Sequence, residues 1–323
     1  FRFLRKEFRN WLSFLYTDLT ITAPFSQYDF LPAVPSDSHV SKKPEIWDDF
    51  FLRRYYNGTG KRPEHISPFT EGKTMIIQEI RTIDELLQFM NGLYEKHGSR
   101  LWYRGEENAG LTLIPSIQRS ERRIQVERYI TNDFYIRARQ ILDHPPRKHN
   151  YAAWVSLMQH YGLPTRMLDW SESPLIAAFF ATETYRTTPE IDAGVWVLAP
   201  DLLNEMEGFG RCIYPIDADT TQEMLLPAFK HNHHNPELVD RILACSSTEN
   251  DLRMYSQHSN FTVHNSLQKL EDICGENMLY KIIIPCDRKK YFIDSLRVFG
   301  ITESAVYPDL DHISSDLRDS YGI

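Results

Sequence analysis

The sequence predicts an α+β fold in which one mixed or antiparallel sheet is flanked by helices, with a helical N-terminal extension. Segments with apolar residues at helical spacing alternate irregularly with short segments rich in β-branched residues, which is typical of this class. No internal repeat is visible. With 323 residues, of which 42% are apolar, the chain is long enough to bury a full core.

Residues 1–72 are predicted to form an extension that precedes the main domain. Apolar residues recur at helical spacing from Phe1 to Leu15, with Arg and Lys on the other side, which indicates an amphipathic helix. Such a helix docks on a protein or lies on a membrane surface, and we favour a protein contact through residues 1–17. The elements that follow are a proline-containing linker, a short helix and a second loop, expected at residues 18–44, 45–56 and 57–72.

Residues 73–323 are predicted to form the main domain. Strands are expected at residues 73–80, 101–105, 193–199, 260–264 and 279–285. Helices are expected at residues 82–97, 119–142, 151–161, 174–182, 220–230, 236–244, 287–297 and 311–319. Thr82 with Glu85 forms a capping box at the start of the first helix, and Gly98 ends that helix.

Composition excludes several classes of protein. No apolar run approaches the ~20 residues that span a bilayer, so no membrane span is expected. The four cysteines are far apart and form no CxxC pair, so neither a disulfide scaffold nor a zinc module is indicated. Charged residues interrupt any signal-peptide core near Phe1, and the absence of an initiating methionine suggests that residues precede it. We therefore expect a reducing, cytoplasmic setting, with His231, His233 and His234 in a solvated loop rather than a metal site.

The charge is unevenly distributed along the chain. Residues 100–170 carry 11 basic and 7 acidic side chains, whereas residues 171–323 carry 12 basic and 24 acidic ones. Nearly all of the basic residues in the first segment are Arg, whose planar fork binds phosphate or carboxylate at two points. This pattern favours a small phosphate-bearing ligand and disfavours an extended nucleic acid, which the surrounding acid would repel.

The first candidate site segment is Tyr103-Arg104-Gly105, at the end of a short apolar strand. A charged fork beside open glycine backbone suits an anionic ligand, so these three residues are predicted to bind it. The alternative is an edge arginine that pairs with Glu106 or Asp169.

The second candidate segment is residues 158–180, where polar groups are interleaved with strong hydrophobes. Ser173 followed by Pro174 predicts an N-cap, and helix N-termini also attract anions. His160 and Asp169 could form an acid–base pair, or His160 could simply interact with a helix dipole. The residues expected to line one pocket are Arg104, His160, Arg166, Asp169 and Ser173, with Ser171 as a further ligand contact.

Taken together, these segments resemble the FRG domain family, which is named for a Phe/Tyr-Arg-Gly motif. The resemblance covers about residues 100–311. It rests on Tyr103-Arg104-Gly105, Leu113-Ile114-Pro115-Ser116-Ile117, the string from Met158 to Phe180, Gln257-His258-Ser259-Asn260-Phe261-Thr262, and Tyr307-Pro308-Asp309-Leu310-Asp311.

A second resemblance is to ADP-ribosyltransferases of the Arg-Ser-Glu type, which use NAD. It implies that Arg104 holds the pyrophosphate and that Ser171 or Ser173 fixes the ribose. The third element of that family is a catalytic Glu, for which Glu303 and the non-ionisable Gln257 are the candidates here. Two function classes follow: NAD-dependent ADP-ribosyl transfer or NAD cleavage, and a non-catalytic recognition module in stress or phage defence. A metal-dependent nuclease is disfavoured, because the sequence has no clustered carboxylate motif.

Overall fold

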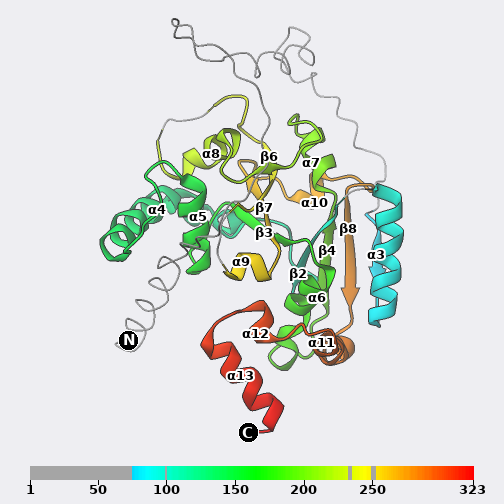
Figure 1. Cartoon of the computed structure of the whole chain (residues 1–323). Helices are drawn as coiled ribbons and strands as arrows, with labels where there is room; N and C mark the ends of the chain where they lie inside the picture. The colour runs from blue at the N-terminus through cyan, green and yellow to red at the C-terminus, as the bar shows by residue number, and fades with distance from the viewer. Residues whose placement is uncertain (1–74, 99, 232–234, 249–251) are drawn as a thin grey trace, which may run out of the picture. The chain divides into compact units, whose positions relative to one another are not determined.

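The computed structural model describes residues 75–98, 100–231, 235–248 and 252–323 (Figure 1). The expected elements of the N-terminal extension, its contact through residues 1–17 and the domain boundary after residue 72 lie outside these residues. Within them the fold is α+β, with eleven α-helices and one eight-stranded mixed sheet, which confirms the predicted class. In this described part, none of the helices combines the length and the apolar character that crossing a membrane requires.

The sheet has the strand order β1-β8-β4-β2-β3-β7-β6-β5. Neighbouring strands are antiparallel except for the outer pairs β1–β8 and β5–β6, which are parallel. The strands are β1 (Ile77–Glu79), β2 (Trp102–Glu106), β3 (Met167–Ser171), β4 (Ala193–Leu198), β5 (Tyr214–Pro215), β6 (Ile242–Ser246), β7 (Ser259–His264) and β8 (Leu279–Ile284).

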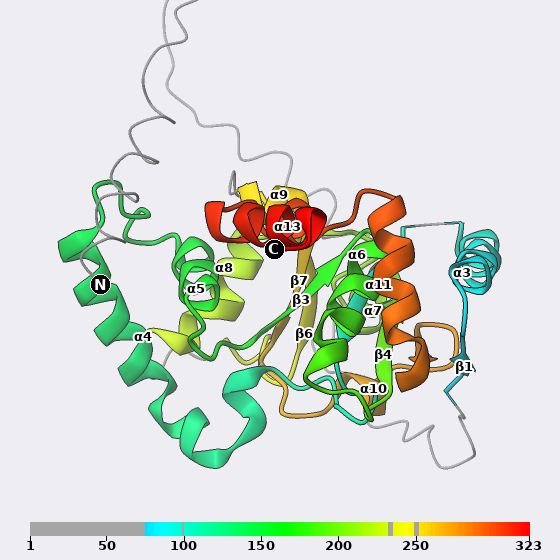
Figure 2. The same ribbon diagram turned by 90° about the horizontal axis from the view of Figure 1, so that it is seen from below.

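The helices lie around this sheet, with α3 and α4 at opposite ends of it (Figure 2). They are α3 (Ile83–His97), α4 (Glu121–Ile141), α5 (Tyr151–His160), α6 (Pro174–Thr182), α7 (Pro200–Met206), α8 (Asp219–Leu225), α9 (Leu252–Ser256), α10 (Leu270–Ile273), α11 (Lys289–Val298), α12 (Glu303–Val306) and α13 (Leu310–Tyr321). The predicted caps of α3 and α6 are confirmed, because Thr82 Oγ1 accepts from Glu85 N and Ser173 Oγ accepts from Ile176 N.

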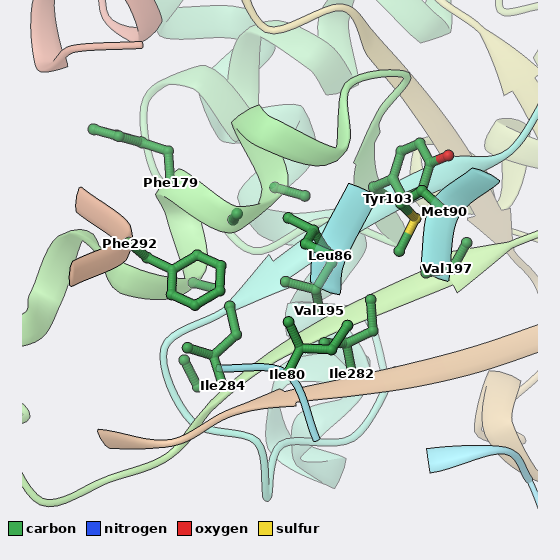
Figure 3. Packing of buried hydrophobic residues seen from close by; sticks show 14 of the residues in the cluster. Ile80, Leu86, Met90, Tyr103, Phe179, Val195, Val197, Ile282, Ile284 and Phe292 are labelled. Carbon is green, nitrogen blue, oxygen red and sulfur yellow. The ribbon is translucent and has the colours of Figure 1, made fainter. Parts of the chain in front are cut away.

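Alternation along the central strand β4 divides the core between the two faces of the sheet. Val195 and Val197 pack with side chains of α3, α6 and α11, a cluster seen from close by in Figure 3. Trp196 and Leu198 pack on the other face, against residues of α7 and α10. Because successive strand side chains point to opposite faces, both faces of this strand are buried.

The predicted helix at residues 236–244 is wrong. Residues 236–240 form a turn, and Ile242–Ser246 is strand β6, which pairs with β7 in antiparallel register. Asp240 has a φ of 60°, a left-handed conformation that a continuing α-helix does not allow. The four residues from Ile242 to Cys245 are fully buried, and periodicity alone does not distinguish a buried strand from a buried helix in so short an apolar run.

Candidate functional site

The candidate site lies where strands β2 and β3 separate. The two strands are paired with each other at Tyr103 and Ser171. Beyond this pair, β2 stays hydrogen-bonded to β4, and β3 stays hydrogen-bonded to β7. Arg104 lies just beyond that pair, and its Nη1 donates a hydrogen bond of 2.8 Å to the backbone oxygen of Asp169. A side chain therefore bridges the two strands at the point where their ladder stops.

A cleft of about 300 Å³ opens at this separation. Its walls come from β2 and Glu107, which follows it, from β3, from the end of α6 with the 3₁₀ helix that follows (Glu183–Arg186), and from residues 257 and 259. The ionisable acidic and basic groups that line it are one guanidinium and four carboxylates, namely Arg104, Glu106, Glu107, Asp169 and Glu183.

Arg104 is partly buried and ion-paired within the cleft. Its Nε lies 2.7 Å from Oε1 of Glu106, and the two side chains are 17% and 10% exposed. The pairing with Glu106 that the sequence offered as an alternative is thus present. Among the described residues, Nη2 of Arg104 makes no hydrogen bond, so the guanidinium keeps donors for a ligand.

The carboxylate of Asp169 is positioned by the end of α5. Gln159 Nε2 donates to Asp169 Oδ1 at 2.5 Å, and Gln159 in turn accepts from Thr165 Oγ1 at 2.5 Å. Thr165, Gln159 and Asp169 therefore form a connected hydrogen-bond chain that ends at the cleft.

The hydroxyls of Ser171 and Ser173 are engaged with the backbone. Ser171 Oγ donates to the carbonyl oxygen of Gln257 at 2.7 Å and accepts from Ser173 N at 3.0 Å. Ser173 caps α6 through its contact with Ile176 N, and it is not among the residues that line the cleft. The expected ribose contact of either serine stays a prediction.

Glu183 is a cleft carboxylate that the sequence reasoning missed. The hydroxyl of Tyr307 lies 3.3 and 3.2 Å from its two carboxylate oxygens. The carbonyl of Val306 accepts from Nε2 of Gln257 at 3.1 Å, so the same short segment contacts both walls of the cleft. In the sequence, the only signal for Glu183 was its position directly after the predicted helix at residues 174–182.

The structure separates the other predicted site residues. Arg166 lines a second cavity, where it forms a two-point ion pair with Glu127. His160 ends α5, with its ring 5.0 Å from that of Tyr161, and does not line the cleft. Glu303 begins α12 and lines a smaller pocket of about 50 Å³. Of the five residues expected in one pocket, Arg104 and Asp169 are the two that the cleft contains.

Tyr103 and Gly105 line the cleft and are also tightly packed. Burial raises the pKa of the Tyr103 phenol to about 12. A Cβ at position 105 would lie 2.0 Å from the backbone oxygen of Ala177, so the close approach of α6 to β2 requires glycine there. The described residues hold no group of three or more His, Cys, Asp or Glu side chains that could bind a metal ion, and His233 and His234 lie outside them.

Comparison with known families identifies part of the chain. Residues 99–190 match the FRG domain. No curated protein and no solved structure matches the chain. The matched segment includes β2, β3 and α6, whereas Gln257 and Tyr307 lie beyond it. The chain therefore contains an FRG domain, and the strands of that domain that separate at Arg104 form the candidate site.

Proposed function

We propose that the cleft binds NAD and that the protein breaks the bond between nicotinamide and ribose, in ADP-ribosyl transfer or in NAD cleavage. The observation that carries this proposal is a guanidinium with uncommitted donors beside several carboxylates in one cleft. The guanidinium suits a pyrophosphate, and the carboxylates suit a positive centre.

The balance of charge in the cleft favours NAD over a simple phosphate. One arginine faces four carboxylates, so a ligand that is only anionic is repelled by most of the lining. NAD carries a cationic nicotinamide ring at one end and a pyrophosphate in its middle. Such a ligand can place its negative groups at Arg104 and its positive ring among the carboxylates.

The proposed chemistry needs a carboxylate near the ribose. When the bond to nicotinamide breaks, the electron pair leaves with the ring nitrogen and the ribose carbon becomes positive. A carboxylate stabilises this oxocarbenium-like centre, as in glycoside hydrolysis, until water or an acceptor nucleophile bonds to the carbon and loses its proton. We assign this role to Glu183 in place of Glu303, because Glu183 lines the cleft and is held by Tyr307.

Nicotinamide release from NAD tests this assignment. Glu183→Gln keeps the shape of the side chain and removes its charge, so release is expected to fall by about 10²- to 10³-fold. Glu303→Gln is the matched control, because Glu303 does not line the cleft, and its rate is expected to stay near that of the wild type. Equal losses in the two variants would contradict the assignment to Glu183.

The second candidate function is a recognition module that binds the nucleotide without cleaving it. The engagement of Ser171 and Ser173 with backbone groups favours this candidate, because a ribose contact would have to replace those hydrogen bonds. Tight binding of ADP-ribose by a wild-type protein that releases no nicotinamide would support the module over the enzyme. The free thiols of Cys212, Cys245, Cys274 and Cys286 suit the cytoplasmic setting that we propose for either function.

A further inference from the structure

A second cavity of about 260 Å³ lies at the other end of strands β3 and β7. It is bounded by α4, by α8 and by the turn at residues 235–240, and it shares no lining residue with the cleft. This volume is slightly below the usual range for drug-sized ligands, so the cavity suits a molecule with a single ring. The proposed NAD chemistry gives it no role.

Two of the charged groups in this cavity, Arg166 and Glu127, neutralise each other. Arg166 donates from Nε and Nη2 to the two carboxylate oxygens of Glu127, and from Nη1 to Asn265 Oδ1. The side chains of Arg166 and Glu127 are 11% and 9% exposed. This buried ion pair therefore presents no net charge of its own to a ligand.

Two neutral polar atoms remain without a partner at this cavity. Oε1 of Gln118 and Nδ1 of His264 are buried and make no hydrogen bond among the described residues, although both residues line the cavity. Gln118 is only partly buried as a residue, and its Nε2 donates to the backbone oxygen of His264 at 3.3 Å. Rotation of the terminal amide exchanges this long hydrogen bond for a contact between the oxygen and a ligand. A buried polar atom that lacks a partner is costly, and a suitable ligand removes that cost.

His264 is held as a neutral ring beside Thr262. Burial, together with the charge of Arg104, lowers the pKa of His264 to about 3, so the ring is neutral. Thr262 Oγ1 accepts from Trp170 Nε1 and lies 2.9 Å from Nε2 of His264. We take Thr262 as the donor to Nε2, an arrangement in which the ring proton lies on Nδ1 and is available as a donor.

Apolar side chains and two carboxylates make up the rest of the cavity lining. Ile124, Val239 and Leu267 are apolar side chains that stay 37%, 45% and 61% exposed, and all three line the cavity. Glu223 and Asp240 supply carboxylates to the same lining. An apolar ring fits these walls, and a negatively charged ligand is repelled by the two carboxylates.

We propose that this cavity binds a neutral one-ring ligand that carries a primary carboxamide. The amide oxygen accepts from Nδ1 of His264, and the amide NH₂ donates to Oε1 of Gln118. A carboxylate of the same shape has no proton to offer Gln118 and is also repelled by Glu223 and Asp240.

Calorimetric titration with benzamide and benzoate tests the proposal on the whole chain. Benzamide is expected to bind at least about tenfold more tightly than benzoate. Val239→Trp fills the cavity from an exposed position, and Gln118→Leu removes the acceptor, so each is expected to weaken benzamide binding by about tenfold or more. Val298→Trp places the same ring on an exposed site of α11 and is expected to bind as the wild type does.

Three results would overturn the proposal. They are equal affinity for the two probes, unchanged benzamide binding by Val239→Trp, and no benzamide binding at its solubility limit. Glu183→Gln separates this cavity from the cleft, because Glu183 lines only the latter of the two. Benzamide binding that is lost in Glu183→Gln and kept in Val239→Trp would place the ligand in the cleft instead.

Discussion

A methyl group at position 105 would lie 2.0 Å from the backbone oxygen of Ala177 and 2.7 Å from the backbone nitrogen of Ala181. Neither atom can move without shifting α6, so we expect Gly105→Ala to lower the free energy of unfolding by about 3 kcal/mol or more. Chemical denaturation measures this change. Gly92→Ala is the matched control, because its added Cβ meets nothing within 4 Å beyond its chain neighbours and the backbone of its own helix, and α3 should gain about 0.5–1 kcal/mol. Similar behaviour of the two variants would contradict the packing argument.

Burial of His264 makes the free energy of unfolding depend on pH. Its pKa is lowered to about 3 in the folded protein, mainly by burial, whereas an unfolded histidine titrates near 6.5. Between these values the unfolded chain binds a proton that the folded protein does not, so stability falls as the pH falls from about 6.5 towards 3. Burial also lowers the pKa of His97, so this residue too makes the folded protein less stable as the pH falls.

Urea unfolding at pH 7 and pH 5 measures this dependence. We expect the free energy of unfolding to be lower at pH 5, with a slope of up to about 1.4 kcal/mol per pH unit for each such group. A free energy that is equal or higher at pH 5 would contradict the burial of a neutral His264.

At the scale of elements, the sequence predicted those structures whose signals are local. The N-cap of α3 and that of α6 are each contained within four residues, so both helices were found. The sequence predicts a helix where strand β6 lies, because the strand depends on pairing with β7, which is distant along the chain. Strand β5 has two residues, which is too few to show the alternation of apolar and polar residues that predicts a strand.

The segment between α12 and α13 is predicted to position the cleft carboxylate. Tyr307→Phe removes the hydrogen bonds to Glu183 and should cost about 1 kcal/mol in the free energy of unfolding. Because Glu183 then loses these two contacts, we expect the kcat for nicotinamide release to fall by about tenfold with little change in KM. Tyr321→Phe, at an exposed position of α13, is the control and should leave kcat unchanged. A normal kcat in Tyr307→Phe would contradict this positioning role.

At the scale of the whole molecule, the cleft depends on segments that are far apart in the sequence. Arg104 and Asp169 lie in the segment that matches the FRG domain, and the sequence motifs around them are sufficient to predict that both belong to the site. The carboxylate Glu183 could not be selected from the sequence, because its place in the cleft follows from the separation of β2 and β3 and from its contact with Tyr307. Arg166 was assigned to the same site because it is near Asp169 in sequence, yet it lines the other cavity.

The most direct test of the account is a calorimetric comparison of NAD and NADH, which have similar size but differ in the charge of the nicotinamide ring. Because carboxylates outnumber the single arginine in the cleft, we expect the wild type to bind NAD about tenfold more tightly than NADH, a difference of ~1.4 kcal/mol. Arg104→Ala should weaken the binding of both by about 1.5–3 kcal/mol, since each loses a charge-assisted contact to its pyrophosphate. Equal affinity of the wild type for NAD and NADH, or binding of neither, would contradict the account.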